Sequence, residues 1–241
     1  MLVVQPDPLD PMYELEGWFT EAGVSWTCVR PYAGEPVPER LEADGLVVLG
    51  GDMSSLDDAG YPWLEDIRAL QRDASDREAP SLGICLGAQL MAQAFGGRTA
   101  VGDRGLETGV ARVEWLPAAA VDPVHAGLPH PFLAGTMHGD MVAELPKDAT
   151  WLGTGPEYPH QAFRVGRTSW GVQFHPEINH AAYLTWVHDH RNPSEQDRER
   201  LASGDEDLLA HEDVVLRGNR RLISNFTGVL RAAADLGAAS R

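Results

Sequence analysis

Four short apolar runs alternate with helical stretches over residues 1–95, and this alternation constrains the fold more than any other feature of the sequence. The runs are "MLVVQ", "VSWTCV", "DGLVVLGG" and "APSLGIC", and helical spacing is found in residues 12–23, 62–79 and 86–95. Strands that alternate with helices of this length predict an α/β fold with a parallel, doubly wound sheet. The runs contain few polar residues, as expected of strands covered on both faces.

The pattern changes in residues 98–175. The segments "TGVARVEW", "HQAFRV" and "SWGVQF" alternate more regularly and predict antiparallel strands added to one side of the sheet, the last two forming a hairpin around Gly166. After Pro176 the chain becomes helical again, and residues 190–241 predict a charged, amphipathic extension of one or two helices packed on the domain. Without repeats or a clear linker, residues 1–241 are expected to form a single domain.

Charge and cysteine content exclude several classes of protein. The chain has 36 acidic and 19 basic residues and a net charge of −17, which argues against a nucleic-acid or anionic-membrane partner. Two cysteines in 241 residues do not make a disulfide scaffold and indicate reduced thiols. The N-terminus lacks the pattern of a secretion signal, and no run reaches the roughly 18 apolar residues of a membrane span. A cytoplasmic protein is the expectation.

The segment "SLGICLGAQL" places Cys85 where an apolar strand gives way to a helix. Ligands of parallel sheets bind beyond the carboxyl ends of the strands. A tight strand–helix turn needs small neighbours, which Gly83 and Gly87 supply, and a helix N-terminus stabilises a thiolate. The Leu86 N–H, directly after the thiol, is free to bind an oxyanion. The alternative is a small buried hydrophobic cysteine.

A base for this thiol is offered by "SWGVQFHPEINH", in which His175 ends an apolar strand. The strand end would place the imidazole on the same rim of the sheet as Cys85. Glu177, two residues later, can reach back to the ring and fix its tautomer, as the carboxylate does in Ser-His-Asp sites. The alternative is a solvated His-Pro-Glu turn.

Together, "GICLGAQLMAQAFGG" and "GVQFHPE" resemble the class I, or triad-type, glutamine amidotransferases over residues 44–180. The resemblance implies a flavodoxin-like fold and a Cys-His-Glu triad that releases ammonia from glutamine. It makes Cys85 the nucleophile, His175 the base and then the acid, and Glu177 the orienting carboxylate. The sequence itself gives no reason to expect a metal or an organic cofactor.

The same resemblance suggests residues that bind the substrate. "GLVVLGGDMS" is similar to the family's Gly-Gly loop, which makes the Gly51 N–H a second oxyanion donor beside that of Leu86, with Gly50 allowing close approach. Gln89 corresponds to a glutamine that contacts the substrate. "TMHGDMV" resembles a segment of the GMP-synthetase-like branch, in which Asp140 would hold the α-amino group and His138 would shape the pocket wall. Glu107 is assigned only proximity to the pocket.

Other motifs favour simpler interpretations. His188, Asp189 and His190 in "WVHDHRN" do not converge as metal ligands on a helix and indicate a solvated helix end. "LGGDMSSLDDAG" lacks the Gly-Lys-Ser/Thr of a nucleotide-binding loop. Cys28 is expected in the core. The tryptophans at element positions are expected to serve packing: Trp18, Trp63, Trp115 and Trp186.

Three functions remain open at this point. In the first, the chain is a free-standing amidotransferase that passes ammonia to a separate acceptor subunit such as a synthetase. In the second, it is a hydrolase of γ-glutamyl compounds that uses the same triad. In the third, it is a regulatory subunit that has kept the fold. The intact set of Cys85, His175 and Glu177 argues against the third.

Overall fold

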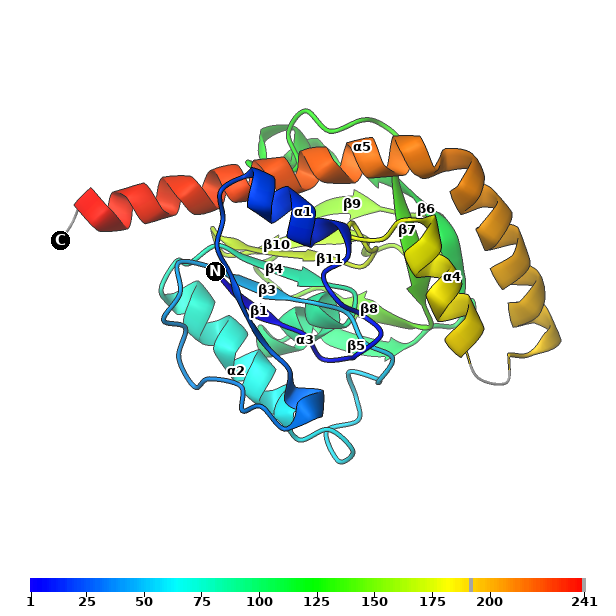
Figure 1. Ribbon diagram of the computed structural model, residues 1–241, viewed down its shortest axis with the longest axis horizontal. Helices are drawn as coiled ribbons and strands as arrows, with labels where there is room; N and C mark the ends of the chain where they lie inside the picture. Colours follow the sequence, from blue (N-terminus) through cyan, green and yellow to red (C-terminus); the bar gives the residue numbers. More distant parts are fainter. Residues whose placement is uncertain (191–192, 240–241) are drawn as a thin grey trace.

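Five parallel strands form one half of a nine-stranded sheet in the computed structural model, which describes residues 1–190 and 193–239 (Figure 1). They follow one another with helices between most of them, so the doubly wound α/β arrangement is confirmed. In sheet order they are β2 (Thr27–Val29), β1 (Leu2–Val4), β3 (Leu46–Val48), β4 (Ser81–Ile84) and β11 (Ser169–Val172).

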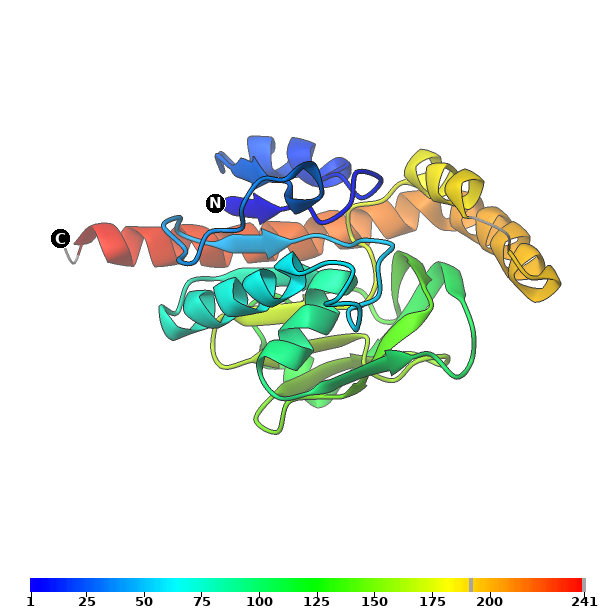
Figure 2. The ribbon, with the colours of Figure 1, turned by 90° about the horizontal axis from the view of Figure 1, so that it is seen from below.

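Helices cover both faces of the parallel strands. Val3 and Val47 point to the face covered by α1 (Glu14–Glu21) and α5 (Glu195–Ala239). Their neighbours in the same strands point to the opposite face, which is covered by α2 (Trp63–Asp76) and α3 (Leu86–Ala94). Figure 2 shows α2 and α3 together on one side of β1 and β3, with α1 on the other. Burial on both faces explains why these strands contain almost no polar residues.

Antiparallel strands form the other half of the sheet and a small separate sheet. The expected hairpin around Gly166 is confirmed, since the two strands on either side of it pair antiparallel. Beyond β11 the sheet continues with β10 (Ala162–Val165), β9 (Thr150–Thr154), β6 (Glu107–Trp115) and β7 (Phe132–His138), and the small sheet pairs β5 (Arg98–Val101) with β8 (Asp140–Glu144).

The position of β11 differs from the expectation. The sequence pattern predicts β11 as one of the antiparallel strands added at one side, but β11 pairs in parallel with β4, with Val172 opposite Ile84. It therefore lies inside the sheet, between β4 and β10. Because Cys85 follows β4 directly and His175 lies three residues beyond β11, the register of this pair brings the two segments together.

Two helices follow the sheet. These are α4 (His180–Asp189) and α5, a single helix of 45 residues that packs against β6, β7 and α1. Leu208, Val215 and Phe226 of α5 are fully buried, so this helix contributes to the core along much of its length. Of the extension predicted at residues 190–241, residues 191–192 and 240–241 lie outside the described residues. Among the helices described, none has the length and apolar character needed to cross a membrane.

Candidate active site

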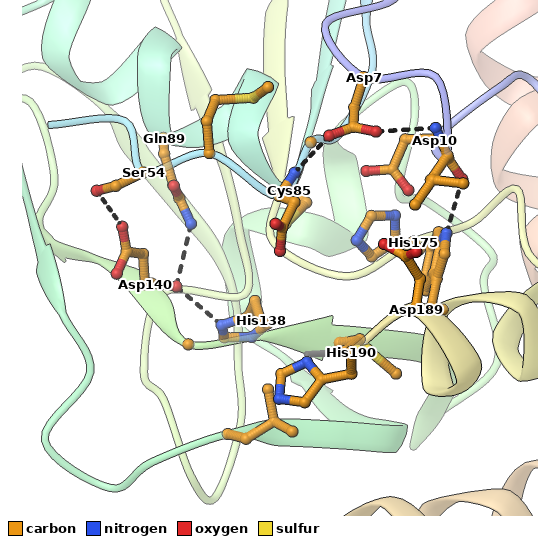
Figure 3. Close-up of a pocket in the computed structure, with 18 of the residues that line it drawn as sticks. Asp7, Asp10, Ser54, Cys85, Gln89, His138, Asp140, His175, Asp189 and His190 are labelled. Atoms are coloured by element: carbon orange, nitrogen blue, oxygen red, sulfur yellow. Dashed lines mark hydrogen bonds between the residues drawn. The ribbon is translucent and has the colours of Figure 1, made fainter. Parts of the chain in front are cut away.

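Cys85 occupies the turn between β4 and α3, at the carboxyl edge of the parallel strands. Its backbone has φ 49° and ψ −105°, a conformation rare for residues other than glycine. The side chain is 6% exposed and lines a cavity of about 580 Å³ (Figure 3). Strain of this kind at a strand–helix turn presents a side chain above the sheet, where a ligand can reach it.

The two glycines flanking Cys85 have no room for a side chain. A Cβ on Gly83 would lie 2.5 Å from the carbonyl oxygen of Gly87. A Cβ on Gly87 would lie 2.9 Å from the carbonyl carbon of Val48 and closer still to its oxygen. The turn therefore requires both glycines because α3 begins in direct contact with its own strand and with β3.

Replacing Gly87 with alanine should destabilise the protein by about 3 kcal/mol, because the added methyl group meets backbone rather than a flexible side chain. The measurement is the free energy of unfolding in urea. Gly228→Ala is the matched control, since Gly228 also lies in a helix but has nothing within 4 Å of a new Cβ. A Gly87→Ala protein as stable as the control would contradict the close approach.

His175 and Glu177 form a buried pair beside Cys85. The Nδ1 of His175 lies 2.6 Å from Oε1 of Glu177, and the two residues are 2% and 1% exposed. This hydrogen bond leaves Nε2 as the ring nitrogen available to a thiol or substrate. The ring of Trp186 packs edge-on against the imidazole at 4.6 Å between centroids and holds its plane.

The charges around His175 favour the imidazolium form. Burial alone would lower the pKa of His175, but the charges and hydrogen bonds of Glu177 and Cys85 raise it well above its usual value. The imidazolium of His175 therefore lies beside Cys85, and α3 begins at the thiol with its positive end. The arrangement suits a nucleophile coupled to a general acid and base.

Two backbone N–H groups are available to an anion at this turn. The N–H groups of Gly51 and Leu86 donate to no acceptor in the part of the chain that the structure describes. Gly51 lines the cavity, and a Cβ on it would lie 3.0 Å from the Leu86 side chain, so the two segments are neighbours. A Cβ on Gly50 would lie 2.7 Å from both the His175 ring and the Asp10 carboxylate, so Gly50 admits the imidazole.

Polar side chains line the cavity on the α3 side of Cys85 (Figure 3). Gln89 donates its amide N–H to the backbone oxygen of Asp140, at 3.0 Å, and Asp140 accepts a hydrogen bond from Ser54 at 2.6 Å. The ring of His138 is held at both nitrogens, by the Asp140 backbone oxygen at 2.9 Å and by Glu107 at 2.7 Å. Glu107, to which the sequence analysis assigns no role, thus positions His138.

Asp7 and Asp10, which the sequence analysis does not select, line the cavity beside His175. They follow β1 in "LVVQPDPLD", so the rule that finds Cys85 beyond the carboxyl end of β4 also finds them. Asp7 accepts hydrogen bonds from the N–H groups of Leu9 and Asp52. Burial raises the pKa of Asp10 to about 7, His175 opposes this shift, and nearby carboxylates add to it.

The end of α4 supplies part of the cavity rim. Asp189 and His190 line the cavity, whereas His188 is exposed and bonds to the backbone oxygen of Leu184 in its own helix. Within residues 1–190 and 193–239, no three His, Cys, Asp or Glu side chains are placed to share a metal ion. Trp186 lines the cavity as well as packing against His175, a role that its spacing in the sequence did not indicate.

Sequence comparison relates the chain to one protein family and to glutamine-hydrolyzing and gamma-glutamyl-cleaving enzymes. The model of the family described as glutamine amidotransferase class-I matches residues 13–187. One subunit of a glutamine-hydrolyzing GMP synthase from Methanothrix thermoacetophila is 35% identical over 161 residues, which cover 66% of this chain and 81% of that protein. Gamma-glutamyl peptidase 5 of Arabidopsis thaliana is 31% identical over 167 residues, covering 67% of this chain and 65% of the peptidase.

The chain corresponds to only part of some relatives. The glutamine-hydrolyzing GMP synthase of Bacillus subtilis is 32% identical over 147 residues, which cover 60% of this chain but 26% of that enzyme. The chain thus spans about a quarter of the Bacillus protein. The crystal structure of a glutamine amidotransferase from Thermotoga maritima superposes with a TM-score of 0.81 at 26% identity, covering 94% of this chain and 96% of the other.

Proposed function

Because the chain belongs to the class I glutamine amidotransferases, we propose that it hydrolyses the side-chain amide of glutamine with Cys85, His175 and Glu177 as its catalytic triad. The observation that carries this assignment is the buried His175–Glu177 pair, 2.6 Å between Nδ1 and Oε1, beside a thiol held at φ 49°. A thiol, a base and a carboxylate that orients the base are the parts that covalent acyl transfer needs.

The reaction begins with attack of the Cys85 thiolate on the γ-carbonyl carbon of glutamine. The oxyanion that forms receives the N–H groups of Gly51 and Leu86, and each such donor typically contributes about 2.7–4 kcal/mol to the transition state. His175 gives its proton to the departing nitrogen, so the C–N bond breaks and ammonia leaves a thioester on Cys85. His175 then takes a proton from water, which cleaves the C–S bond and releases glutamate.

The substrate's amino acid portion belongs on the α3 side of Cys85. We propose that Asp140 binds the α-ammonium group of glutamine, since one carboxylate oxygen is held by Ser54 and the other has no donor among the described residues. The Oε1 of Gln89 can accept a second hydrogen bond from the same α-ammonium group, because only its amide N–H is used within the protein. His138, held by Glu107, forms the wall of the pocket on this side. Gly50 leaves space for the His175 ring.

The ammonia requires an acceptor. We propose that the partner is a separate synthetase subunit, on the ground that the archaeal relative is itself one subunit of a GMP synthase and aligns over 81% of its length. The packing of α5 on the sheet supports a single domain for residues 1–241. A cytoplasmic location remains a prediction from the two free cysteines.

The test is the release of glutamate and ammonia from glutamine by the purified protein, together with labelling by a diazoketone analogue of glutamine. We expect one equivalent of analogue on Cys85 and none on Cys28, as measured by mass spectrometry of peptides. Absence of both turnover and Cys85 labelling would contradict the proposal. Labelling without turnover would indicate a triad that needs its partner subunit.

A second function is favoured by one specific observation. The cavity of about 580 Å³ is large for a substrate whose leaving group is ammonia, and it lies within the usual range for pockets that hold larger ligands. The similarity to a γ-glutamyl peptidase points the same way. Hydrolysis of γ-glutamyl amides with the same triad is therefore the alternative.

A further inference from the structure

The cavity has two chemically different sides, separated by Cys85 (Figure 3). Gln89, Ser54 and Asp140 lie on one side, and Asp7, Asp10 and His175 lie on the other. In the proposed reaction His175 delivers a proton to the departing nitrogen, so the leaving group must lie on the side of His175. The glutamyl portion is then left to the Asp140 side.

The cavity as a whole is strongly acidic. Five aspartates line it, and neither lysine nor arginine occurs among its described lining residues. Glutamine carries one positive and one negative charge away from its amide, so its recognition does not require this excess of carboxylates. The aspartates are Asp7, Asp10, Asp52, Asp140 and Asp189.

Asp10 is the buried aspartate on the His175 side of the cavity whose carboxylate accepts no hydrogen bond from the described residues. It is 8% exposed. The carboxylate faces the cavity next to His175, and both groups lie 2.7 Å from the position of a Gly50 Cβ (Figure 3). By contrast, Asp7 accepts hydrogen bonds from two backbone N–H groups, and Asp140 accepts one from Ser54 on the other side of the cavity.

A buried carboxylate that accepts no hydrogen bond is unfavourable, and a cation that donates one to it removes this cost. With its pKa raised to about 7, the Asp10 carboxyl group is only partly ionised near neutral pH. A cation bound beside it would favour the ionised form. The cavity volume leaves room for a chain of several atoms beyond the amide nitrogen.

We infer that the cavity accepts γ-glutamyl amides whose leaving amine carries a second, cationic nitrogen, and that Asp10 is the binding residue for this cation. The inference rests on the proposed acyl transfer at Cys85 and defines its leaving group. Cys85 forms the thioester, the C–N bond of the amide breaks, His175 protonates the departing nitrogen, and a diamine leaves in place of ammonia. Water then cleaves the thioester to give glutamate and regenerate the thiol.

The experiment compares three amides of similar length: γ-glutamylputrescine, γ-glutamyl-n-pentylamine and γ-glutamyl-4-aminobutyrate, with terminal ammonium, methyl and carboxylate groups. Glutamine serves as the reference substrate. We expect kcat/KM for the putrescine derivative to exceed that of the pentylamine derivative by about 10-fold or more, the range of a charge-assisted hydrogen bond. Binding of the same amides to Cys85→Ala protein, measured by calorimetry, should show the same order.

Two variants separate the proposed contact between Asp10 and the substrate's terminal ammonium group from an effect of Asp10 on the triad. Asp10→Asn should lower the ratio of kcat/KM for the putrescine derivative to kcat/KM for the pentylamine derivative by about 10-fold, because any effect through His175 is common to both amides. Asp148→Asn is the matched control, because Asp148 is exposed and outside the cavity, and it should change neither value.

The outcomes distinguish this inference from the proposed function. Turnover of glutamine with no preference for the cationic amide, in hydrolysis or in binding, would overturn the inference and leave the glutaminase proposal standing. Equal losses for both amides in Asp10→Asn would also overturn it, because Asp10 would then act through His175. Selective binding of the cationic amide to Cys85→Ala protein would support it even where turnover requires a partner subunit. Failure to bind or hydrolyse any of the four compounds would overturn both.

Discussion

Replacing Cys85 with alanine is expected to lower glutamine hydrolysis by at least about 10⁴-fold, because the reaction loses the atom that forms the thioester. The fold should remain intact. The side chain is small, alanine fills most of its volume, and the strained backbone is imposed by the turn between β4 and α3 rather than by the thiol. The measurement is the rate of glutamate release, with the unfolding midpoint of the same sample.

Cys28→Ala is the matched control for this variant. Cys28 is the other free cysteine, half-buried in β2 and away from the cavity. It should keep the glutaminase activity of the unmodified protein. Substantial turnover by Cys85→Ala, or loss of turnover in Cys28→Ala at unchanged stability, would show that the nucleophile has been misassigned.

Glu177→Gln should lower kcat by about 10²–10⁴-fold, since a carboxylate in this position fixes the tautomer of the base and stabilises its charged form. The charge of Glu177 contributes to the raised pKa of His175, so its removal should lower that pKa. If His175 must be protonated to release the amine, activity is lost as pH rises through its pKa. The alkaline limb of the pH–rate profile should therefore move to lower pH.

The matched control for Glu177→Gln is another His–Glu pair. Glu114 lies 3.0 Å from the ring of His130, but both side chains are more than half exposed and neither lines the cavity. Glu114→Gln should leave the rate and the pH profile unchanged. A reduced rate in Glu177→Gln with an unmoved alkaline limb would mean that Glu177 serves only to pack the loop after β11.

The parallel half of the fold is predictable because its strands are short apolar runs separated by clear helices. β7 has no such signal: "FLAGTMH" mixes small, polar and apolar residues, and it becomes a strand through seven-residue pairing with β6. The small sheet of β5 and β8 is likewise formed by contacts between distant segments. Local pattern cannot reveal strands whose stability comes from their partners.

Some residues of the candidate site can likewise be predicted from the sequence, and others only from the folded structure. Cys85 and His175 are found from the sequence because both follow strands whose carboxyl ends face a ligand. Asp10 also follows a parallel strand, β1, but its segment "QPDPLDP" matches no motif that marks a binding residue. Asp189 and His190 reach the cavity from α4, and only the packing of α4 against β6, β7 and α5 brings them there. This packing joins segments far apart in the chain, so it cannot be predicted from the residues around Asp189 and His190.

The position of β11 inside the sheet has a consequence for the order in which the site matures. Residues 81–84 leave the ribosome long before residues 169–172, so the nascent chain carries its reactive thiol for some time without the imidazole. The pair forms only when β11 docks beside β4 in the one register that sets Val172 opposite Ile84. In the mechanism proposed above, a chain in which β11 is not docked in this register therefore cannot hydrolyse glutamine, and activity requires the correctly paired central sheet.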